Sequence, residues 1–88
     1  MREFDLIGRY GGDEFVIVLP GTSQHHALQI AERFRKTIEQ TDAPHYTISI
    51  GIATYPRDGI TVKALIEAAD AGLYKSKARG RNTVSYKN

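Results

Sequence analysis

Two short apolar segments near the N-terminus are separated by a glycine-rich tripeptide. Residues 4–10 and 14–19 have the composition of strands, and the tripeptide Gly-Gly-Asp at 11–13 lies between them. A Gly-Gly pair favours a tight hairpin turn with positive φ angles. The run 15–19 is almost wholly apolar, which is typical of a strand covered on both faces. The pattern therefore predicts a β-hairpin with a buried second strand.

Two later segments repeat apolar residues every three or four positions, which is the spacing of one helical face. Thr22 or Ser23 can cap the first helix and Thr61 the second. Gly80 fits the position just past the end of the second helix. The expected buried stripe of the first helix is Ala27, Ala31, Phe34 and Ile38. That of the second helix is Val62, Leu65, Ala69 and Leu73.

The segment 46–55 alternates and is rich in β-branched residues, which predicts a strand between the two helices. Gly51 within it leaves a place where another group can approach the backbone. Loops are expected at 41–44 and 56–59, and a short last strand at 82–86. The order strand, strand, helix, strand, helix, strand predicts an α/β sandwich with helices packed on a mixed sheet.

The expected sheet is thin. A strand–helix–strand crossover often leaves room for another strand between its two ends. With so few strands, the apolar segment 15–19 is at risk of forming an open edge. The pattern therefore suggests that a strand is missing from this chain.

Composition adds limits to this picture. The chain has 88 residues, which is at most one domain. It has no cysteine, which excludes disulfides and thiolate metal sites. Apolar residues make up 41% and charged residues 25%, as in an ordinary soluble protein. No apolar run approaches the roughly 20 residues of a membrane span, and no export signal is evident. A cytoplasmic location without membrane contact is expected.

Charge is unevenly distributed. Residues 71–88 contain five cations and no acidic residue, whereas residues 1–70 contain seven cations and ten acidic residues. A basic end favours phosphate-bearing partners. The alternative is a solvated helix end whose cations complement the helix dipole. Nucleic-acid binding is disfavoured, because the acidic first part would repel a phosphate backbone.

Candidate chemistry gathers at the predicted hairpin turn. Asp13 and Glu14 are adjacent carboxylates, and side chains alternate in a strand, so one of them can project toward a ligand. Carboxylates beside phosphates commonly hold Mg²⁺. Gly11 and Gly12 leave room for a bulky phosphorylated ligand at the backbone. The alternative is a hairpin whose acidic residues serve solubility.

The turn sequence at 9–15, Arg-Tyr-Gly-Gly-Asp-Glu-Phe, resembles the GGDEF family of diguanylate cyclases and contains its naming motif. Two further segments resemble the family. Thr-Ile-Ser-Ile-Gly-Ile-Ala at 47–53 looks like the strand after the first helix. Ala-Asp-Ala-Gly-Leu-Tyr-Lys-Ser-Lys at 69–77, followed by Gly-Arg-Asn at 80–82, looks like the closing helix and turn. The resemblance implies a nucleotidyl-cyclase palm-like fold.

The resemblance implies a transferase that condenses two GTP molecules into cyclic di-GMP and releases pyrophosphate. It implies Mg²⁺ or Mn²⁺ as cofactor and a homodimer whose subunits face each other. Asp13 is implied as a metal ligand near the attacking 3′-hydroxyl, and Glu14 as a second metal ligand or a base. Gly11 and Gly12 are implied to lie against the nucleotide phosphates.

Two cations near the C-terminus belong to the same resemblance. Lys77 and Arg81 are implied to reach the triphosphate, where cations can neutralise phosphate oxygens. Complementation of the helix dipole is the alternative, and we assign that role to Lys75 and Arg79.

Other polar residues are given no ligand role. Asp70 and Tyr74 belong to the closing-helix motif, and we expect them to position that helix. His25 and His26 are adjacent on a helix and face different directions, so a shared metal ion is not expected. His45 is assigned no role.

Arg2 and Asp5 form an Arg-x-x-Asp set, with Asp5 six residues before Gly11. This is the spacing of the family's inhibitory site, which binds the product and implies allosteric feedback. An arginine and a carboxylate can read a guanine edge. Arg33 matches a secondary arginine of that site, with Arg35 a near neighbour. An exposed ion pair is the alternative.

The resemblance identifies residues 1–88 as the C-terminal portion of a single GGDEF domain. The absent half is expected to hold the central first strand, with an aspartate of the metal site, and the helices that read guanine. We therefore predict that this chain alone is inactive. An upstream sensor or receiver domain is expected in the parent protein. The alternative function is a module that senses cyclic di-GMP without catalysis.

Overall fold

The structure, a computed structural model, describes residues 6–40 and 47–87. Its elements follow the predicted order of strands and helices. They are β1 (Leu6–Gly11), β2 (Glu14–Pro20), α1 (Gln24–Glu39), β3 (Ser49–Tyr55), α2 (Val62–Ala78) and β4 (Val84–Tyr86). The α/β class is confirmed. The loop expected at 41–44 lies outside the described residues.

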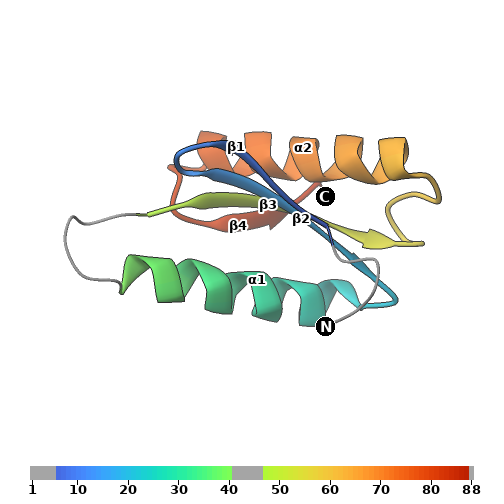
Figure 1. The fold of residues 1–88 in the computed structure, drawn as a ribbon, viewed down its shortest axis with the longest axis horizontal. Coiled ribbons are helices and arrows are strands. Elements are labelled where there is room, and N and C mark those ends of the chain that lie inside the picture. Colours follow the sequence, from blue (N-terminus) through green and yellow to red (C-terminus); the bar gives the residue numbers. More distant parts are fainter. Residues whose placement is uncertain (1–5, 41–46, 88) are drawn as a thin grey trace.

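The four strands form one mixed sheet in the order β1-β2-β3-β4. β1 and β2 are antiparallel, whereas β2–β3 and β3–β4 are parallel pairs. Figure 1 shows α1 on one face of the sheet and α2 on the other. Both parallel pairs are joined by a helix, as parallel strands require.

Alternation along β2 divides the core between the two helices. Ile17 and Leu19 belong to the apolar cluster that includes α1 residues, and Val16 and Val18 to the cluster that includes α2 residues. All four side chains are at most 4% exposed. β2 is therefore covered on both faces, as its apolar run predicted.

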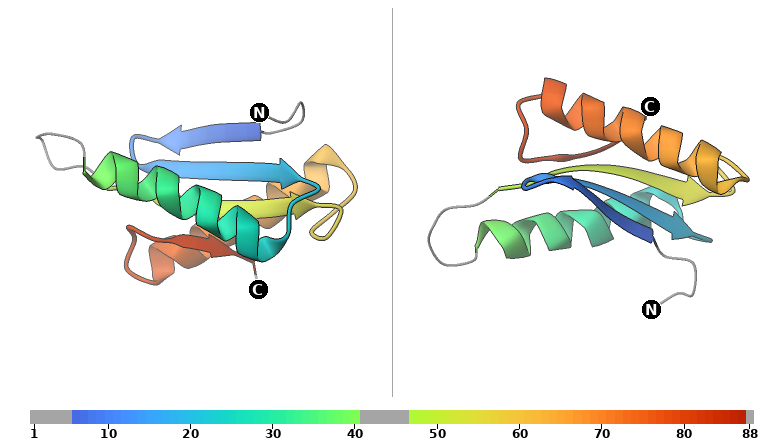
Figure 2. Two further views of the ribbon diagram at one scale, coloured as in Figure 1. Left: turned by 90° about the horizontal axis from the view of Figure 1, so that it is seen from below. Right: turned by 45° about the horizontal axis from the view of Figure 1, so that its top comes forward.

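The expectation that 15–19 forms an open edge is wrong. β2 lies between β1 and β3, and β1 forms the outer edge of the sheet, as Figure 2 shows. The expected room for another strand is also not observed among the described residues, because Val16 pairs directly with Gly51. The physical reason is that a buried strand must satisfy its backbone groups on both sides.

Gly51 is a place of close approach, as predicted. A Cβ atom there would overlap backbone atoms of Ala69 and Leu73 in α2. The Ser76 hydroxyl, also on α2, donates a hydrogen bond of 2.7 Å to the Ile50 carbonyl oxygen. These contacts fix the height of α2 above the sheet and thereby the position of its C-terminal end.

The helix starts agree with the predicted caps. The Ser23 hydroxyl, rather than that of Thr22, accepts from the His26 amide, and the Thr61 hydroxyl accepts from the Ala64 amide. Val62 is 65% exposed, so its expected burial is wrong. It occupies the first helical position, where the helix has not yet reached the sheet. No helix of the described residues is long and apolar enough to cross a membrane.

Candidate functional site

The hairpin turn consists of Gly12 and Asp13, because Gly11 ends β1 and pairs with Glu14. The ladder shifts register between Arg9 and Gly11, which is the signature of a β-bulge. The expected positive φ angles at Gly11 and Gly12 are wrong. Among the described residues, Gly21 and Gly80 are the only glycines with positive φ angles.

The Arg9 side chain forms hydrogen bonds with two backbone carbonyl groups of the hairpin. Its Nε donates to the Gly11 carbonyl oxygen at 3.2 Å and its guanidinium NH2 to that of Gly12 at 3.1 Å. The same guanidinium lies 5.7 Å from the centroid of the Phe15 ring. Sequence reasoning missed this role of Arg9. Its position just before a turn with available carbonyl groups was the signal that could have indicated it.

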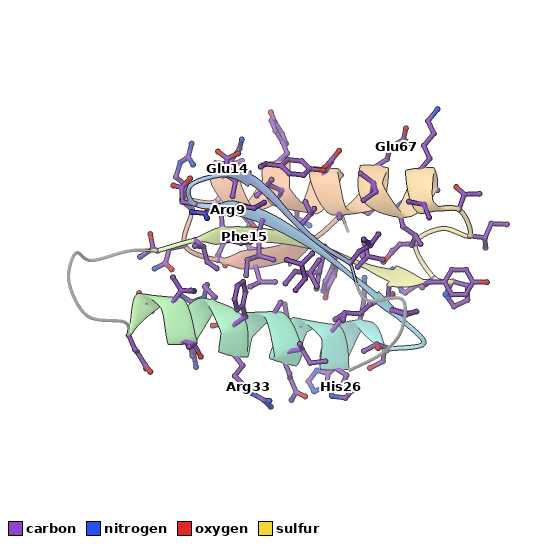
Figure 3. All side chains as sticks on the ribbon, in the orientation of Figure 1. Arg9, Glu14, Phe15, His26, Arg33 and Glu67 are labelled. Carbon is purple, nitrogen blue, oxygen red and sulfur yellow. The ribbon has the colours of Figure 1, made fainter. Side chains whose placement is uncertain are left out.

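Glu14 faces the C-terminal end of α2. Its Oε2 lies 3.4 Å from the Nζ of Lys77 and 3.7 Å from a terminal guanidinium nitrogen of Arg81. The hairpin carboxylate and the two cations assigned to phosphate therefore lie together, although 63 residues separate Glu14 from Lys77. Figure 3 shows Glu14 and Arg9 at this end of the sheet.

The other hairpin carboxylate is fixed through its backbone. The Asp13 carbonyl oxygen accepts from the Ser49 amide at 2.8 Å, which ties the turn to the start of β3. The Asp13 side chain is half-buried. The structure thus brings Gly11, Gly12, Asp13 and Glu14 to the same edge as the end of α2.

Arg81 reaches Glu14 because of an uncommon backbone turn. Three successive residues have positive φ angles: Gly80 at 107°, Arg81 at 66° and Asn82 at 51°. Such angles are uncommon for residues other than glycine and occur where the surroundings hold them. They reverse the chain after α2.

A partly buried network of hydrogen bonds supports this turn. The Asn82 side chain accepts from Arg35 at 2.7 Å and donates to Glu39 at 3.0 Å, and its backbone amide donates to the Ser49 hydroxyl. Arg35 also forms a bidentate pair with Glu32. Sequence reasoning missed this network, because an Arg and two Glu on one helix are more typical of a solvated face.

The network shifts the ionisation of its members. The hydrogen bond from Arg35 lowers the pKa of the Glu32 carboxyl, and the same bond raises the pKa of Arg35. Both residues are therefore charged at neutral pH. Arg35 is 9% exposed, so it is held inside the structure.

Asp70 connects α2 to the hairpin. Its side-chain hydrogen bond with Tyr10 raises the pKa of that phenol to about 12. This contact agrees with the expected positioning role of Asp70. Tyr74 is 74% exposed, so within the described residues nothing supports the same role for it. Tyr74 lies on the solvent side of α2, where nothing in the described residues covers it.

The other cations near the end of α2 and the two histidines of α1 lie apart from the Glu14 contacts in the described part of the chain. Arg79 caps α2 and donates to the Ser85 hydroxyl at 3.1 Å, and Lys75 lies in the last helical turn. His25 and His26 are exposed on α1. His45 lies outside the described residues.

The predicted inhibitory set is only partly described. Arg2 and Asp5 lie outside the described residues. Arg33 is exposed on the outer side of α1, as Figure 3 shows. Its neighbour Arg35 is engaged in the partly buried network with Glu32, Glu39 and Asn82. Of the two arginines, Arg33 is therefore the one accessible to a ligand.

The carboxylates at the hairpin can supply part of a metal site. The described residues contain no group of three or more histidine or acidic side chains able to hold an ion. Mg²⁺ is commonly held by one or two carboxylates together with substrate phosphates and water. Asp13 and Glu14 are the hairpin carboxylates that could contribute to a site of that kind, and Lys77 and Arg81 lie beside Glu14.

Comparison with known proteins shows which family the sequence matches. Residues 1–83 match the family described as "Diguanylate cyclase, GGDEF domain". The chain is 41% identical over 90 residues to diguanylate cyclase A of Treponema denticola, covering 96% of this chain and 24% of that protein. It is 41% identical over 92 residues to the response regulator PleD of Caulobacter vibrioides, covering 96% of this chain and 20% of that protein.

A third relative is diguanylate cyclase DosC of Escherichia coli, which is 40% identical over 91 residues, covering 96% of this chain and 20% of that protein. The chain thus spans about a quarter or less of the length of these relatives. No solved structure matches it. The family match extends over nearly the whole chain and includes the hairpin turn. The chain therefore belongs to the GGDEF family.

Proposed function

We propose that this chain is the C-terminal portion of a diguanylate cyclase domain, which condenses two GTP molecules into cyclic di-GMP. The observation that carries the proposal is the meeting of Glu14 with Lys77 and Arg81. A metal–triphosphate complex carries charges of both signs. The carboxylate can bind its metal ion, and the two cations can bind its phosphate oxygens. An isolated hairpin kept for solubility would need no such partners.

In the proposed reaction, each 3′-hydroxyl oxygen forms a bond to the α-phosphorus of the other GTP. The bond from that phosphorus to the bridging oxygen breaks, and pyrophosphate leaves from each nucleotide. Lys77 and Arg81 would hold phosphate oxygens, and Gly11 and Gly12 would let phosphates approach the turn backbone. Such catalysis depends mainly on alignment and charge neutralisation.

A divalent cation, Mg²⁺ or Mn²⁺, would neutralise phosphate charge and acidify the attacking hydroxyl when bound. Asp13 and Glu14 are the residues that we propose would hold it. The Asp13 main chain is fixed to β3, which limits the movement of its carboxylate. The reaction joins two nucleotides, so we also propose that two copies of the domain face each other.

A chimera tests the proposal. Residues 1–88 replace the matching segment of the Treponema relative, and cyclic di-GMP formation from GTP is measured by chromatography. We expect product formation that falls at least about 100-fold in the Asp13→Asn chimera, as for other losses of transition-state charge stabilisation. Lys77→Met should also lower product formation, because it removes a cation proposed to hold phosphate. Lys75→Met is the matched control, since it removes the same charge two positions away. A folded chimera that binds GTP without forming product would contradict the proposal.

We further propose that the 88-residue chain alone does not form cyclic di-GMP. The described residues contain no group of three or more acidic or histidine side chains that could hold an ion, so we propose that Asp13 and Glu14 are only part of the cation site. Incubation of the purified chain with GTP and Mn²⁺ checks this. Sustained, metal-dependent product formation would show that the chain is sufficient.

Product feedback is a separate proposal for Arg2, Asp5 and Arg33. The supporting observation is that Arg33 is exposed whereas its neighbour Arg35 is held internally. Titration of cyclic di-GMP into the chain should show binding that weakens about tenfold or more in Arg33→Ala, as expected for lost charge-assisted hydrogen bonds. Lys36→Ala removes an exposed cation of the same helix and should leave the Kd unchanged. Equal weakening by both variants would indicate a general charge effect.

A further inference from the structure

One carboxylate oxygen of Glu14 forms ion pairs with both cations that we propose bind phosphate, Lys77 and Arg81. Oε2 of Glu14 is the atom nearest to Lys77 and also to Arg81. The Glu14 side chain is 24% exposed, that of Lys77 33% and that of Arg81 53%. The single negative charge of Glu14 therefore offsets part of the positive charge of Lys77 and Arg81, where the proposed function puts a phosphate oxygen.

This arrangement weakens the site for either ligand alone. A phosphate approaching Lys77 and Arg81 must compete with the negative charge already between them. A divalent cation approaching Glu14 is repelled by the two cations beside it. When a phosphate and a divalent cation bind together, both repulsions are relieved. The phosphate would pair with Lys77 and Arg81, and the Glu14 carboxylate would be free to bind the metal.

The exchange requires only side-chain movement. The turn is held by Arg9 and by the bond from Ser49 to the Asp13 carbonyl. The C-terminal end of α2 is held by Ser76. The three charged side chains are partly exposed and long, so they can change rotamer without disturbing this frame.

We infer that Glu14 acts as a phosphate substitute in the ligand-free chain, and that polyphosphate and divalent cation therefore bind with positive coupling. The ligand class rests on the proposed function. The coupling itself rests on the two ion pairs. The site accepts the metal–polyphosphate complex in preference to either component.

The first test measures polyphosphate binding without metal. Tripolyphosphate is titrated into the 88-residue chain in EDTA, with circular dichroism verifying that each variant is folded. Glu14→Gln should tighten the Kd about fivefold, which corresponds to two partly exposed ion pairs released. Asp13→Asn removes the same charge from the neighbouring residue, which forms no ion pair within the described part of the chain, and should leave the Kd nearly unchanged.

The second test measures Mn²⁺ alone by electron paramagnetic resonance. Lys77→Met should tighten Mn²⁺ binding about threefold by freeing Glu14. Lys75→Met is the matched control and should have little effect. In the Glu14→Gln background the Lys77→Met substitution should not increase the affinity for Mn²⁺, because the ion pair between Glu14 and Lys77 no longer exists.

The outcomes separate the inference from the proposed function. Equal tightening of tripolyphosphate by Glu14→Gln and Asp13→Asn, or no tightening by Glu14→Gln, would overturn the inference. If no variant binds tripolyphosphate, the phosphate site of the proposed function fails, and the Mn²⁺ series decides the inference. A gain in Mn²⁺ affinity from Lys77→Met that persists without Glu14 would overturn it.

Discussion

Gly51 shows how much can depend on the absence of one side chain. α2 crosses β3 so closely that its Ala69 and Leu73 backbone atoms occupy the space of a Cβ. Gly72 of α2 makes the matching approach to Ser85 of β4. Because backbone atoms cannot rotate away, this contact sets the position of the whole helix and of the cations at its end.

Substituting alanine for Gly51 should therefore destabilise the chain. We expect a loss of about 3 kcal/mol in the free energy of unfolding, the upper range for overpacking in a core. Urea unfolding followed by circular dichroism measures it. Gly11→Ala is the control, because its added methyl group would meet only Glu14 at ordinary van der Waals distance. Equal losses for the two variants would show that the close approach is not the cause.

At the scale of elements, α1 and the turn after α2 are joined by charged side chains. Arg35 of α1 contacts Glu32, Glu39 and Asn82, and Asn82 follows directly after Arg81. The network thus links a helix on one face of the sheet to the chain reversal that directs Arg81 toward Glu14. It is a structural support of the candidate site that does not itself contact it.

Removing Arg35 should lower stability in a pH-dependent way. Arg35→Met leaves Glu32 and the side-chain oxygen of Asn82 without their donor, whereas Glu39 keeps the hydrogen bond from Asn82. The substitution should cost about 2 kcal/mol at pH 7. The pKa of Glu32 is lowered in the folded chain, so its contribution is present above the ordinary value of 4.5. That contribution is lost as the pH falls through the folded pKa.

Urea unfolding at pH 7 and pH 3 checks this prediction. The difference between wild type and Arg35→Met should be smaller at pH 3, because this pH lies below the ordinary Glu32 pKa of 4.5, where the stabilisation from the lowered pKa is progressively lost. Arg33→Met, an exposed arginine of the same helix, serves as control and should change little at either pH. A difference that does not depend on pH would argue against the ion pairs as the source of stability.

At the scale of the whole molecule, one sheet separates two apolar clusters. Ile50 and Ile52 contribute to the cluster on the α1 side, and Ala53 to the cluster on the α2 side. Because the same strands contribute to both clusters, neither can be lost without disturbing the other. The molecule should therefore unfold as one cooperative unit.

Substitutions in the two clusters test this cooperativity. Ile50→Ala and Leu65→Ala should each cost about 3 kcal/mol, as for other large-to-small core changes. Circular dichroism and tyrosine fluorescence should give coincident urea transitions for both variants. Val62→Ala, at a 65% exposed position, is the control. Separate transitions for the two probes in either variant would show that the clusters unfold independently.

The sequence was informative wherever structure depends on neighbours along the chain. Periodicity predicted both helices, and Ser23, Thr61 and Gly80 marked their ends. The apolar run of β2 correctly predicted burial on both faces. The motif residues of the hairpin and of α2 were sufficient to indicate the family, because they are contiguous in the chain.

Tertiary structure decided what depends on residues far apart in the chain. The position of β2 inside the sheet, the pairing of Glu14 with Lys77 and Arg81, and the burial of Arg35 are not encoded in local patterns. A charged residue looks the same in sequence whether it is solvated or paired. Only the fold brings opposite charges within reach, and at this site that proximity determines what each residue can bind.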